Sequence, residues 1–364
     1  MHKSAYDYLI VGAGIYGAVF AREAADKGKK CLVIDKRPYI GGNAYTYLTE
    51  GIHVHKYGPH IFHTSEPNIW EYVNKYAEWN AFVNSPLAYY KGKIYNMPIN
   101  MNTFNELWNI TVPSAAKAKI EKERLKITCP QNLEEQALSL VGREIYEIFI
   151  KGYTEKQWDR KCADLPAFII KRLPFRYTFD NNYYNDRFQG IPVNGYTAFI
   201  KNLLDGIEIR LNTPFIHNDI STKKIVYTGC IDEFFNYRLG ALEYRSLRFT
   251  DEIFESENVQ GNAVINYTSA DELFTRRIEH RHFDRNCKSL KSIISTEYSV
   301  QWKIGDEPYY PVNDDKNNGM YSAYAHLAKL EDNVIFGGRL GTYAYLDMDK
   351  VIAAALQMAK IELS

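Results

Sequence analysis

The sequence predicts an α/β protein, and three observations support this class. The first thirty or so residues alternate strand, tight turn, helix and strand. A helical period dominates from residue 68 to about residue 156, and short β-rich runs dominate from about residue 242 to residue 296. A chain of 364 residues, 46% of them hydrophobic, is long enough for two or three domains around a sizeable core.

The amino-terminal segment YDYLIVGAGIYGAVFAREAADKGKKCLVIDKR predicts one βαβ unit. Residues 9–11 form an apolar strand, residues 15–27 a helix, and residues 32–34 a second strand that ends at Asp35. A crossover of about this length is what two parallel strands need. We therefore expect a parallel sheet to begin here.

The turn of this unit carries glycines in GxGxxG spacing, at Gly12, Gly14 and Gly17. Such a turn brings backbone amides against a pyrophosphate at the positive end of the following helix. Asp35 lies close to the position expected for the acid that binds a ribose hydroxyl, which disfavours a 2′-phosphate and hence NADP. The unit therefore predicts dinucleotide binding.

The residues after the second strand favour FAD over NAD. Gly41 and Gly42 form a double glycine with Arg37 before it, a pattern that resembles the flavoprotein group that includes amine oxidases. Near the carboxyl end, VIFGGRL can bring Arg339 back to the same site. Asp347 then precedes a helix whose amino end can face the electron-rich carbonyl region of a flavin.

The rest of the chain predicts three further kinds of segment. Residues 41–64 are rich in Gly and His and are expected to form loop and short strand, and residues 169–196, rich in Pro, Asn, Gly and Arg, a long mobile loop. The runs between about 242 and 296 predict an antiparallel sheet, and the chain ends in strand, turn and helix. One helix face is expected to be buried: Leu133, Ala137, Leu140, Val141, Ile145 and Ile148.

Charge and cysteine content exclude several classes of partner. With 44 basic and 44 acidic side chains there is no electrostatic reason to expect a nucleic acid or an anionic membrane as a partner, and no stretch of eighteen apolar residues predicts a membrane span. The amino terminus runs directly into a strand and does not resemble a signal peptide. The scattered cysteines indicate a reduced, cytoplasmic protein without disulfides or a zinc site: Cys31, Cys129, Cys162, Cys230 and Cys287.

Four histidines lie close together in HVHKYGPHIFHT, at positions 53, 55, 60 and 63. A metal site is conceivable, but no Asp, Glu or Cys joins the group, and histidines alone do not define a coordination geometry. We therefore predict no metal.

Beyond these patterns, long segments in order from residue 6 to the end resemble the bacterial type of UDP-galactopyranose mutase. They include HKYGPHIFHT, KGYTEKQW, LPAFIIKRLPFRYTFDNNYY, QGIPVNGYT, TRRIEHRHF, GDEPYYPVND and GGRLGTYAYLDMD. The resemblance implies an isomerase that interconverts UDP-galactopyranose and UDP-galactofuranose without net redox change, by covalent catalysis through N5 of FAD, which must be reduced. It also implies an electron donor, a homodimer, and a furanose product that supplies cell-surface polysaccharide.

The resemblance also assigns site residues. Arg172 and Arg276 are expected to clamp the diphosphate, since guanidinium groups match phosphate oxygens, with Arg172 on the mobile loop. Catalytic roles fall to Arg172, Arg276, His63 and Tyr345. Substrate-binding positions are Asn84, Tyr153, Thr154, Trp158, Arg172, Tyr183, Asn266, Arg276, Tyr310 and Tyr345. Cofactor-binding positions are Gly12, Gly14, Gly17, Asp35, Lys36, Gly42, Asn43, His60, Arg339 and Asp347.

The expected architecture has three parts. A discontinuous Rossmann-like FAD-binding domain takes residues 1–78, 190–240 and 312–364. A helical domain is inserted at 79–168, followed by the mobile loop at 169–189, and an antiparallel sheet domain takes 241–311. The active site is expected at the junction of the three.

Three other functions are weighed against this one. A flavin oxidase acting on amines or alcohols shares the FAD fingerprints but would lack the two arginines and the paired tyrosines. A non-catalytic nucleotide-sugar or FAD-binding protein is disfavoured because every matched functional position is present. A mutase that accepts UDP-N-acetylgalactosamine remains open, although His63 in HIFHT favours UDP-galactose.

Overall fold

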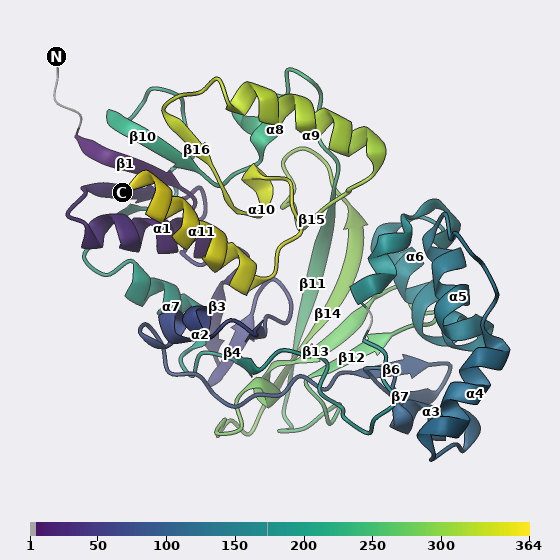
Figure 1. Cartoon of the computed structure of the whole chain (residues 1–364). Coiled ribbons are helices and arrows are strands. Elements are labelled where there is room, and N and C mark those ends of the chain that lie inside the picture. Colours follow the sequence, from purple (N-terminus) through teal and green to yellow (C-terminus); the bar gives the residue numbers. More distant parts are fainter. Residues whose placement is uncertain (1–4, 173) are drawn as a thin grey trace.

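The structure, a computed structural model, describes residues 5–172 and 174–364, with only the backbone of residues 171 and 172. Figure 1 shows a parallel sheet covered by helices at one side of the molecule and a group of helices at the other. Long strands of a second sheet run between them.

The parallel sheet has five strands contributed by widely separated parts of the chain. Neighbouring strands are parallel throughout, so that Ile10 pairs with Val33 on one side and Val226 on the other. Hence this sheet is discontinuous in sequence. The strand order is β16 (Val334–Phe336), β10 (Thr222–Tyr227), β1 (Tyr6–Val11), β2 (Cys31–Ile34) and β9 (Glu208–Arg210).

Helices cover both faces of the parallel sheet, because successive strand residues point to opposite faces and both sets are apolar. Ile10, Val33 and Val226 face the core beneath α1 (Ile15–Asp26), α7 (Gly195–Leu203) and α11 (Met348–Glu362). Leu9 and Leu32 face the opposite core, beneath α8 (Ile231–Phe234) and α9 (Asp315–Ala328). The amino-terminal βαβ prediction is confirmed, with α1 ending at Asp26, one residue earlier than expected.

The second sheet contains two strands that the sequence analysis placed in the helical segment, and this part of the prediction is wrong. Alternation in LAYYKGKIYN, with a turn at Lys91 and Gly92 that has positive φ at both residues, makes a hairpin, β6 (Leu87–Tyr90) and β7 (Lys93–Asn96). The sheet is antiparallel except where β12 pairs with β6 in parallel. Its order is β15 (Tyr310–Pro311), β11 (Tyr244–Phe254), β14 (Ser292–Gln301), β13 (Arg276–Glu279), β12 (Val264–Tyr267), β6 and β7.

The helical part packs around its own core. It comprises α3 (Met101–Trp108), α4 (Pro113–Glu123), α5 (Leu133–Ile145), the π-helix η2 (Tyr146–Lys151) and α6 (Gly152–Trp158). The expected buried face of α5 is partly wrong, because the buried stripe passes through Leu138 and leaves Leu140 47% exposed. Ile148 is only partly buried, beyond a kink at Gly142, where φ is +79°.

Short elements connect these units and border the cavity described below. A hairpin joins β3 (Thr46–Thr49) and β4 (Ile52–His55), and β5 (Phe62–Thr64) pairs with β8 (Phe188–Gly190). The remaining pieces are α2 (Pro67–Asn74), α10 (Gly338–Gly341), and the turns η1 (Gly42–Ala44), η3 (Cys162–Asp164), η4 (Ala167–Arg172) and η5 (His280–Phe283). Among the described residues, no helix has the length and apolar character that crossing a bilayer requires.

Candidate active site

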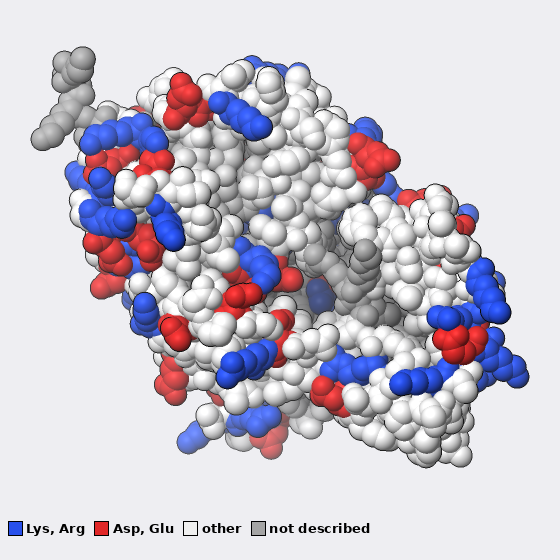
Figure 2. All heavy atoms as spheres, viewed as in Figure 1, with Lys and Arg blue, Asp and Glu red and all other residues white. Residues whose placement is uncertain are grey.

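One cavity of about 1240 Å³ lies where the parallel sheet, the second sheet and the helical part meet. Figure 2 shows a hollow in this face of the molecule, with acidic and basic side chains intermixed around it. Sites for a single ligand usually measure about 300–1,000 Å³. The cavity is therefore large enough for more than one ligand.

The glycine turn closes one end of the cavity with bare backbone. Gly12 has φ of +109°, which favours glycine, and a Cβ there would lie 2.1 Å from Thr228 Oγ1. A Cβ on Gly17 would lie 2.1 Å from the carbonyl oxygen of Gly12, so helix α1 can approach the turn only without a side chain. Gly14 and Gly42 meet across the same turn. These glycines leave the amino end of α1 open toward the cavity.

Asp35 braces this turn from the end of β2. Its buried carboxylate accepts hydrogen bonds from the backbone N–H of Ala13, at 2.8 Å, and of Arg37, at 2.9 Å. The same side chain borders the cavity. Asp35 thus fixes the shape of the turn, a role that the sequence analysis did not foresee, and its contact with a ribose stays a prediction.

A salt bridge that the sequence analysis missed joins the two sheets at the cavity. Arg37 pairs with Glu307, donates a hydrogen bond to Asn43 at 2.9 Å, and lies 4.9 Å from the ring centroid of Tyr57. Nothing local in the sequence marks Glu307 as its partner, since the two residues lie 270 positions apart.

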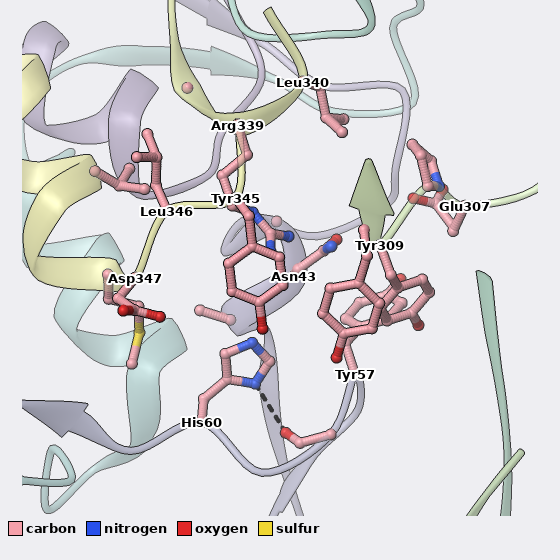
Figure 3. Close-up of a pocket in the computed structure, with 18 of the residues that line it drawn as sticks. Asn43, Tyr57, His60, Glu307, Tyr309, Arg339, Leu340, Tyr345, Leu346 and Asp347 are labelled. Atoms are coloured by element: carbon pink, nitrogen blue, oxygen red, sulfur yellow. Dashed lines mark hydrogen bonds between the residues drawn. The ribbon is translucent and has the colours of Figure 1, made fainter. Parts of the chain in front are cut away.

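His60 borders the cavity, with its ring below the hydroxyl end of Tyr345 (Figure 3). Its Nδ1 lies 2.8 Å from the carbonyl oxygen of Gly58, which can only accept, so Nδ1 carries the hydrogen. Burial lowers the pKa of His60 to about 4, so the ring is neutral at pH 7. His60 therefore presents Nε2 as a hydrogen-bond acceptor.

Two tyrosines that border the cavity stack on each other. The rings of Tyr310 and Tyr345 lie 5.4 Å apart with an angle of 12° between their planes. Burial raises the pKa of Tyr310, so its hydroxyl stays protonated and can donate. Arg339 and Asp347 border the same region, and Asp347 immediately precedes α11 (Figure 3).

Arg276 on β13 is held by a buried carboxylate of the neighbouring strand. Its Nε donates to Oε2 of Glu297 at 2.7 Å, and Thr275 Oγ1 donates to Oε1 at 2.8 Å. Glu297 is only 2% exposed. Burial opposes a charge on Arg276, but the adjacent Glu297 raises the pKa of the guanidinium well above its ordinary value. The site thus holds a fixed cation with further N–H donors.

Helix α6 forms the opposite wall with Tyr153, Thr154 and Trp158. Burial raises the pKa of Tyr153, which keeps its hydroxyl protonated. The preceding π-helix adds Phe149 and Ile150, which the sequence analysis missed. This wall therefore offers flat apolar faces with polar tips.

Lys156 joins α6 to the second sheet. Its ammonium group donates to the carbonyl oxygens of Tyr267, at 2.7 Å, and Phe274, at 2.9 Å, which flank the β12–β13 turn. This turn separates Asn266 from Arg276, both of which border the cavity. Lys156 therefore couples the helical wall to the sheet wall.

The loop before β8 supplies the remaining border. Tyr183 donates its backbone N–H to the carbonyl oxygen of Asn84 at 2.7 Å. His63 Nδ1 lies 2.6 Å from Oδ2 of Asp186, and the His63 ring stacks on Tyr184 with centroids 3.7 Å apart. Sequence reasoning singled out Tyr183 but missed Tyr184 and Asp186, although all three lie in the short stretch NNYYND.

The cavity thus brings together the predicted site residues whose side chains are described, including Lys36, Gly42 and Asn43. Arg172 is the exception: it ends η4, and its side chain lies outside the described residues. The four clustered histidines do not converge, because His55 packs against Phe283 away from the cavity. Within the described ranges, no group of three or more His, Cys, Asp or Glu side chains could hold a metal ion.

Comparisons with known proteins agree on one family. The model of the UDP-galactopyranose mutase family matches residues 148–345, and a model of NAD(P)-binding Rossmann-like domains matches residues 10–76. A probable UDP-galactopyranose mutase of Klebsiella pneumoniae is 43% identical over 96% of this chain and 93% of its own length. A dTDP-fucopyranose mutase of Escherichia coli is 39% identical, and 97% of each chain is covered.

Solved structures support the fold. The crystal structure of a reduced UDP-galactopyranose mutase superimposes with a TM-score of 0.77 at 14% identity, over 99% of this chain and 96% of that one. Putrescine oxidase shares the fold less closely, with a TM-score of 0.60 at 11% identity over 98% and 99% of the two chains. At such identities the likeness concerns architecture alone.

Proposed function

Because the chain belongs to the UDP-galactopyranose mutase family, a family of isomerases with FAD as cofactor, we propose that it interconverts UDP-galactopyranose and UDP-galactofuranose. One observation carries the proposal. A glycine turn typical of dinucleotide binding, a half-buried arginine fixed by a buried carboxylate, and a pair of stacked tyrosines border the same cavity.

The described residues fit FAD. Gly12 and Gly17 leave no space for a Cβ in the turn, and the backbone N–H groups at the amino end of α1 favour an anion. Asp35, Lys36 and Asn43 border the same cavity as the glycine turn. His60 and Arg339 border it as well. When bound and reduced, FAD supplies a nucleophilic nitrogen to this cavity.

The chain itself would bind and orient the nucleotide sugar. Arg276, fixed by Glu297, would neutralise the diphosphate, and Tyr310 and Tyr345 would donate hydrogen bonds to phosphate oxygens. Tyr153 and Trp158 would line the uracil pocket. Arg172 is proposed as the second cation, on the family resemblance. Walls from three parts of the fold would exclude water around the reacting sugar.

The location of the protein, its oligomeric state, its electron donor and the use of its product are proposed from the family resemblance. We propose a cytoplasmic homodimer that takes its electrons from a separate donor, whose product enters cell-surface polysaccharide. The three-part division of the chain into FAD-binding, helical and sheet domains is retained as a proposal, with the β6–β7 hairpin assigned to the sheet.

A second candidate substrate is favoured by the comparisons. The Escherichia coli relative, a dTDP-fucopyranose mutase, is nearly as similar to this chain as the Klebsiella relative is. The two substrates share the diphosphate but differ in a base methyl group and in hydroxyl groups of the ribose and the sugar. Arg276 and the paired tyrosines would serve either one, so the choice depends on the walls at the base and the sugar.

An anaerobic assay of the purified holoenzyme tests the proposal. UDP-galactofuranose, dTDP-fucofuranose and the furanose form of UDP-N-acetylgalactosamine are incubated separately, with and without dithionite, and products are separated by chromatography. We expect conversion of UDP-galactofuranose to the pyranose only with dithionite. Preferred conversion of dTDP-fucofuranose would reassign the substrate. No conversion, together with oxygen uptake on an amine or alcohol, would replace the mutase with an oxidase.

A further inference from the structure

We propose that Asp186 is a positioning residue for His63: its carboxylate holds the hydrogen on Nδ1, so that the imidazole presents Nε2 to the cavity as an acceptor for a ligand hydroxyl. The expected effect on turnover rests on the proposed function. The hydrogen bond between Asp186 and His63 does not depend on that function.

Backbone pairing brings the two residues together from distant parts of the chain. Strand β5 pairs with β8 so that His63 lies opposite Gln189, and Asp186 lies just before β8. The resulting distance from His63 Nδ1 to Asp186 Oδ2 is 2.6 Å. Ser65 donates to the other carboxylate oxygen, Oδ1, at 2.6 Å. Both oxygens of Asp186 are therefore engaged by residues of β5 or its end.

Stacking removes the remaining freedom of the imidazole. The His63 and Tyr184 rings lie 3.7 Å apart at an angle of 15°, so one face of the imidazole is covered. Rotation of His63 would break both this stack and the bond to Asp186. Among the described residues, Nε2 of His63 has no hydrogen-bond partner, and His63 borders the cavity.

The charge of Asp186 sets the direction of the hydrogen bond. Burial would raise the pKa of Asp186, but the hydrogen bonds from Ser65 and His63 hold it below its ordinary value, and Lys350 lies nearby. An ionised carboxylate only accepts, so Nδ1 must donate. In many sites a carboxylate that accepts a hydrogen bond from one ring nitrogen fixes the tautomer and the orientation of a histidine in this way.

His60 provides an internal comparison. Its Nδ1 donates to the carbonyl of Gly58, so His60 and His63, which both border the cavity, each leave Nε2 without its hydrogen. The partners differ in charge: Nδ1 of His63 faces a carboxylate, whereas Nδ1 of His60 faces a neutral carbonyl. The two candidate donors to His63 are a hydroxyl of the sugar and a hydroxyl of the ribityl chain of FAD.

Nitrogen NMR of the holoenzyme with labelled histidine reads the tautomer directly, with His63→Gln to assign the signals. We expect a protonated Nδ1 in the wild type and loss of that preference in Asp186→Asn, with kcat about tenfold lower. UDP affinity and FAD content should not change. Asp180→Asn is the matched control, because Asp180 is an exposed carboxylate of the same loop that pairs with Arg176.

Ligand additions distinguish the two hydroxyl sources. Movement of the Nε2 signal with UDP-galactose but not with UDP assigns the sugar, and movement between apoprotein and holoenzyme assigns the cofactor. Movement in neither arm overturns the acceptor role. A wild-type ring protonated at Nε2 alone would overturn the whole inference, even if Asp186→Asn failed to fold. Because the tautomer is read without turnover, failure of the mutase assignment would leave this test intact.

Discussion

The two ends of the cavity are built in different ways. The cofactor end is backbone, shaped within one continuous stretch by Gly12, Gly17 and the brace from Asp35. The substrate end is made of side chains from α6, β13, β15 and the segment before α11, and contacts between different segments hold Arg276 against Glu297 and Tyr310 against Tyr345. Arg276 and Glu297, for example, lie 21 positions apart on neighbouring strands.

Substitutions at the two ends of the cavity should therefore have different effects. Damage to the glycine turn should remove the cofactor and with it all activity. Damage to the substrate end should leave the flavin bound and affect only the nucleotide sugar. Four predictions test this contrast, from the largest expected effect to the smallest.

Gly17→Ala should abolish FAD binding. Its Cβ would lie 2.1 Å from the backbone oxygen of Gly12, which cannot move without opening the turn. The flavin-to-protein ratio, measured by absorbance, should fall close to zero. Gly319→Ala is the control, because nothing lies within 4 Å of a Cβ there. Retention of stoichiometric FAD in Gly17→Ala would contradict the assigned cradle.

Arg276→Ala should lower kcat/KM by about 10²-fold while FAD stays bound, since it removes a fixed donor to the diphosphate. Glu297→Gln should cause a smaller loss, because it loosens Arg276 without removing it. Arg172→Ala is expected to behave like Arg276→Ala.

Steady-state kinetics with the reduced enzyme checks these variants. Arg277→Ala is the matched control, because neighbouring residues on a strand point to opposite faces. A near-normal kcat/KM in Arg276→Ala would contradict the assignment of Arg276 to diphosphate binding.

Lys156→Met should weaken UDP binding about tenfold, because two hydrogen bonds between α6 and the β12–β13 turn are lost. Calorimetric titration of UDP measures the effect, and FAD content should be unchanged. Lys151→Met, a change at an exposed lysine near the start of α6, should bind UDP normally. Equal UDP affinity in both variants would show that the two walls hold their places without Lys156.

The contribution of Lys156 to the free energy of unfolding should depend weakly on pH. Burial lowers the pKa of Lys156 to about 8 from 10.5, so the unfolded chain binds more protons than the folded one between these values. The contribution of Lys156 to the free energy of unfolding should therefore rise with pH across this interval. Denaturant titrations of wild type and Lys156→Met at pH 7 and pH 10 check the sign. A contribution that falls with pH would contradict it.

Local features of the molecule were predictable from the sequence, and contacts across the chain were not. The βαβ unit follows from apolar runs and glycine spacing within 30 or so residues. The place of the β6–β7 hairpin in the second sheet was missed because β6 pairs with β12, about 180 residues later, and no nearby residue indicates that partner. Leu140 was misplaced because a spacing of three or four residues from Ala137 fits both Leu140 and Val141, and the helix buries Leu138 and Val141 instead.

The candidate site divides in the same way. Its glycines, arginines and tyrosines lie in motifs that resemble a known family, so their positions could be named. Their partners could not: Glu307 behind Arg37 and Asp186 behind His63 are set by tertiary packing. The hydrogen bonds by which Asp35 holds the glycine turn could likewise be found only from the structure, because they depend on the positions of backbone N–H groups.

The central claim is that one cavity holds FAD and the nucleotide side by side. Addition of UDP to the oxidised holoenzyme, followed by visible absorption, tests it most directly. We predict a saturable shift of the flavin bands in the wild type and none at the same UDP concentration in Arg276→Ala, which keeps its flavin. Calorimetric binding of UDP without any change in the flavin spectrum would contradict the claim, because it would place the two ligands in separate sites.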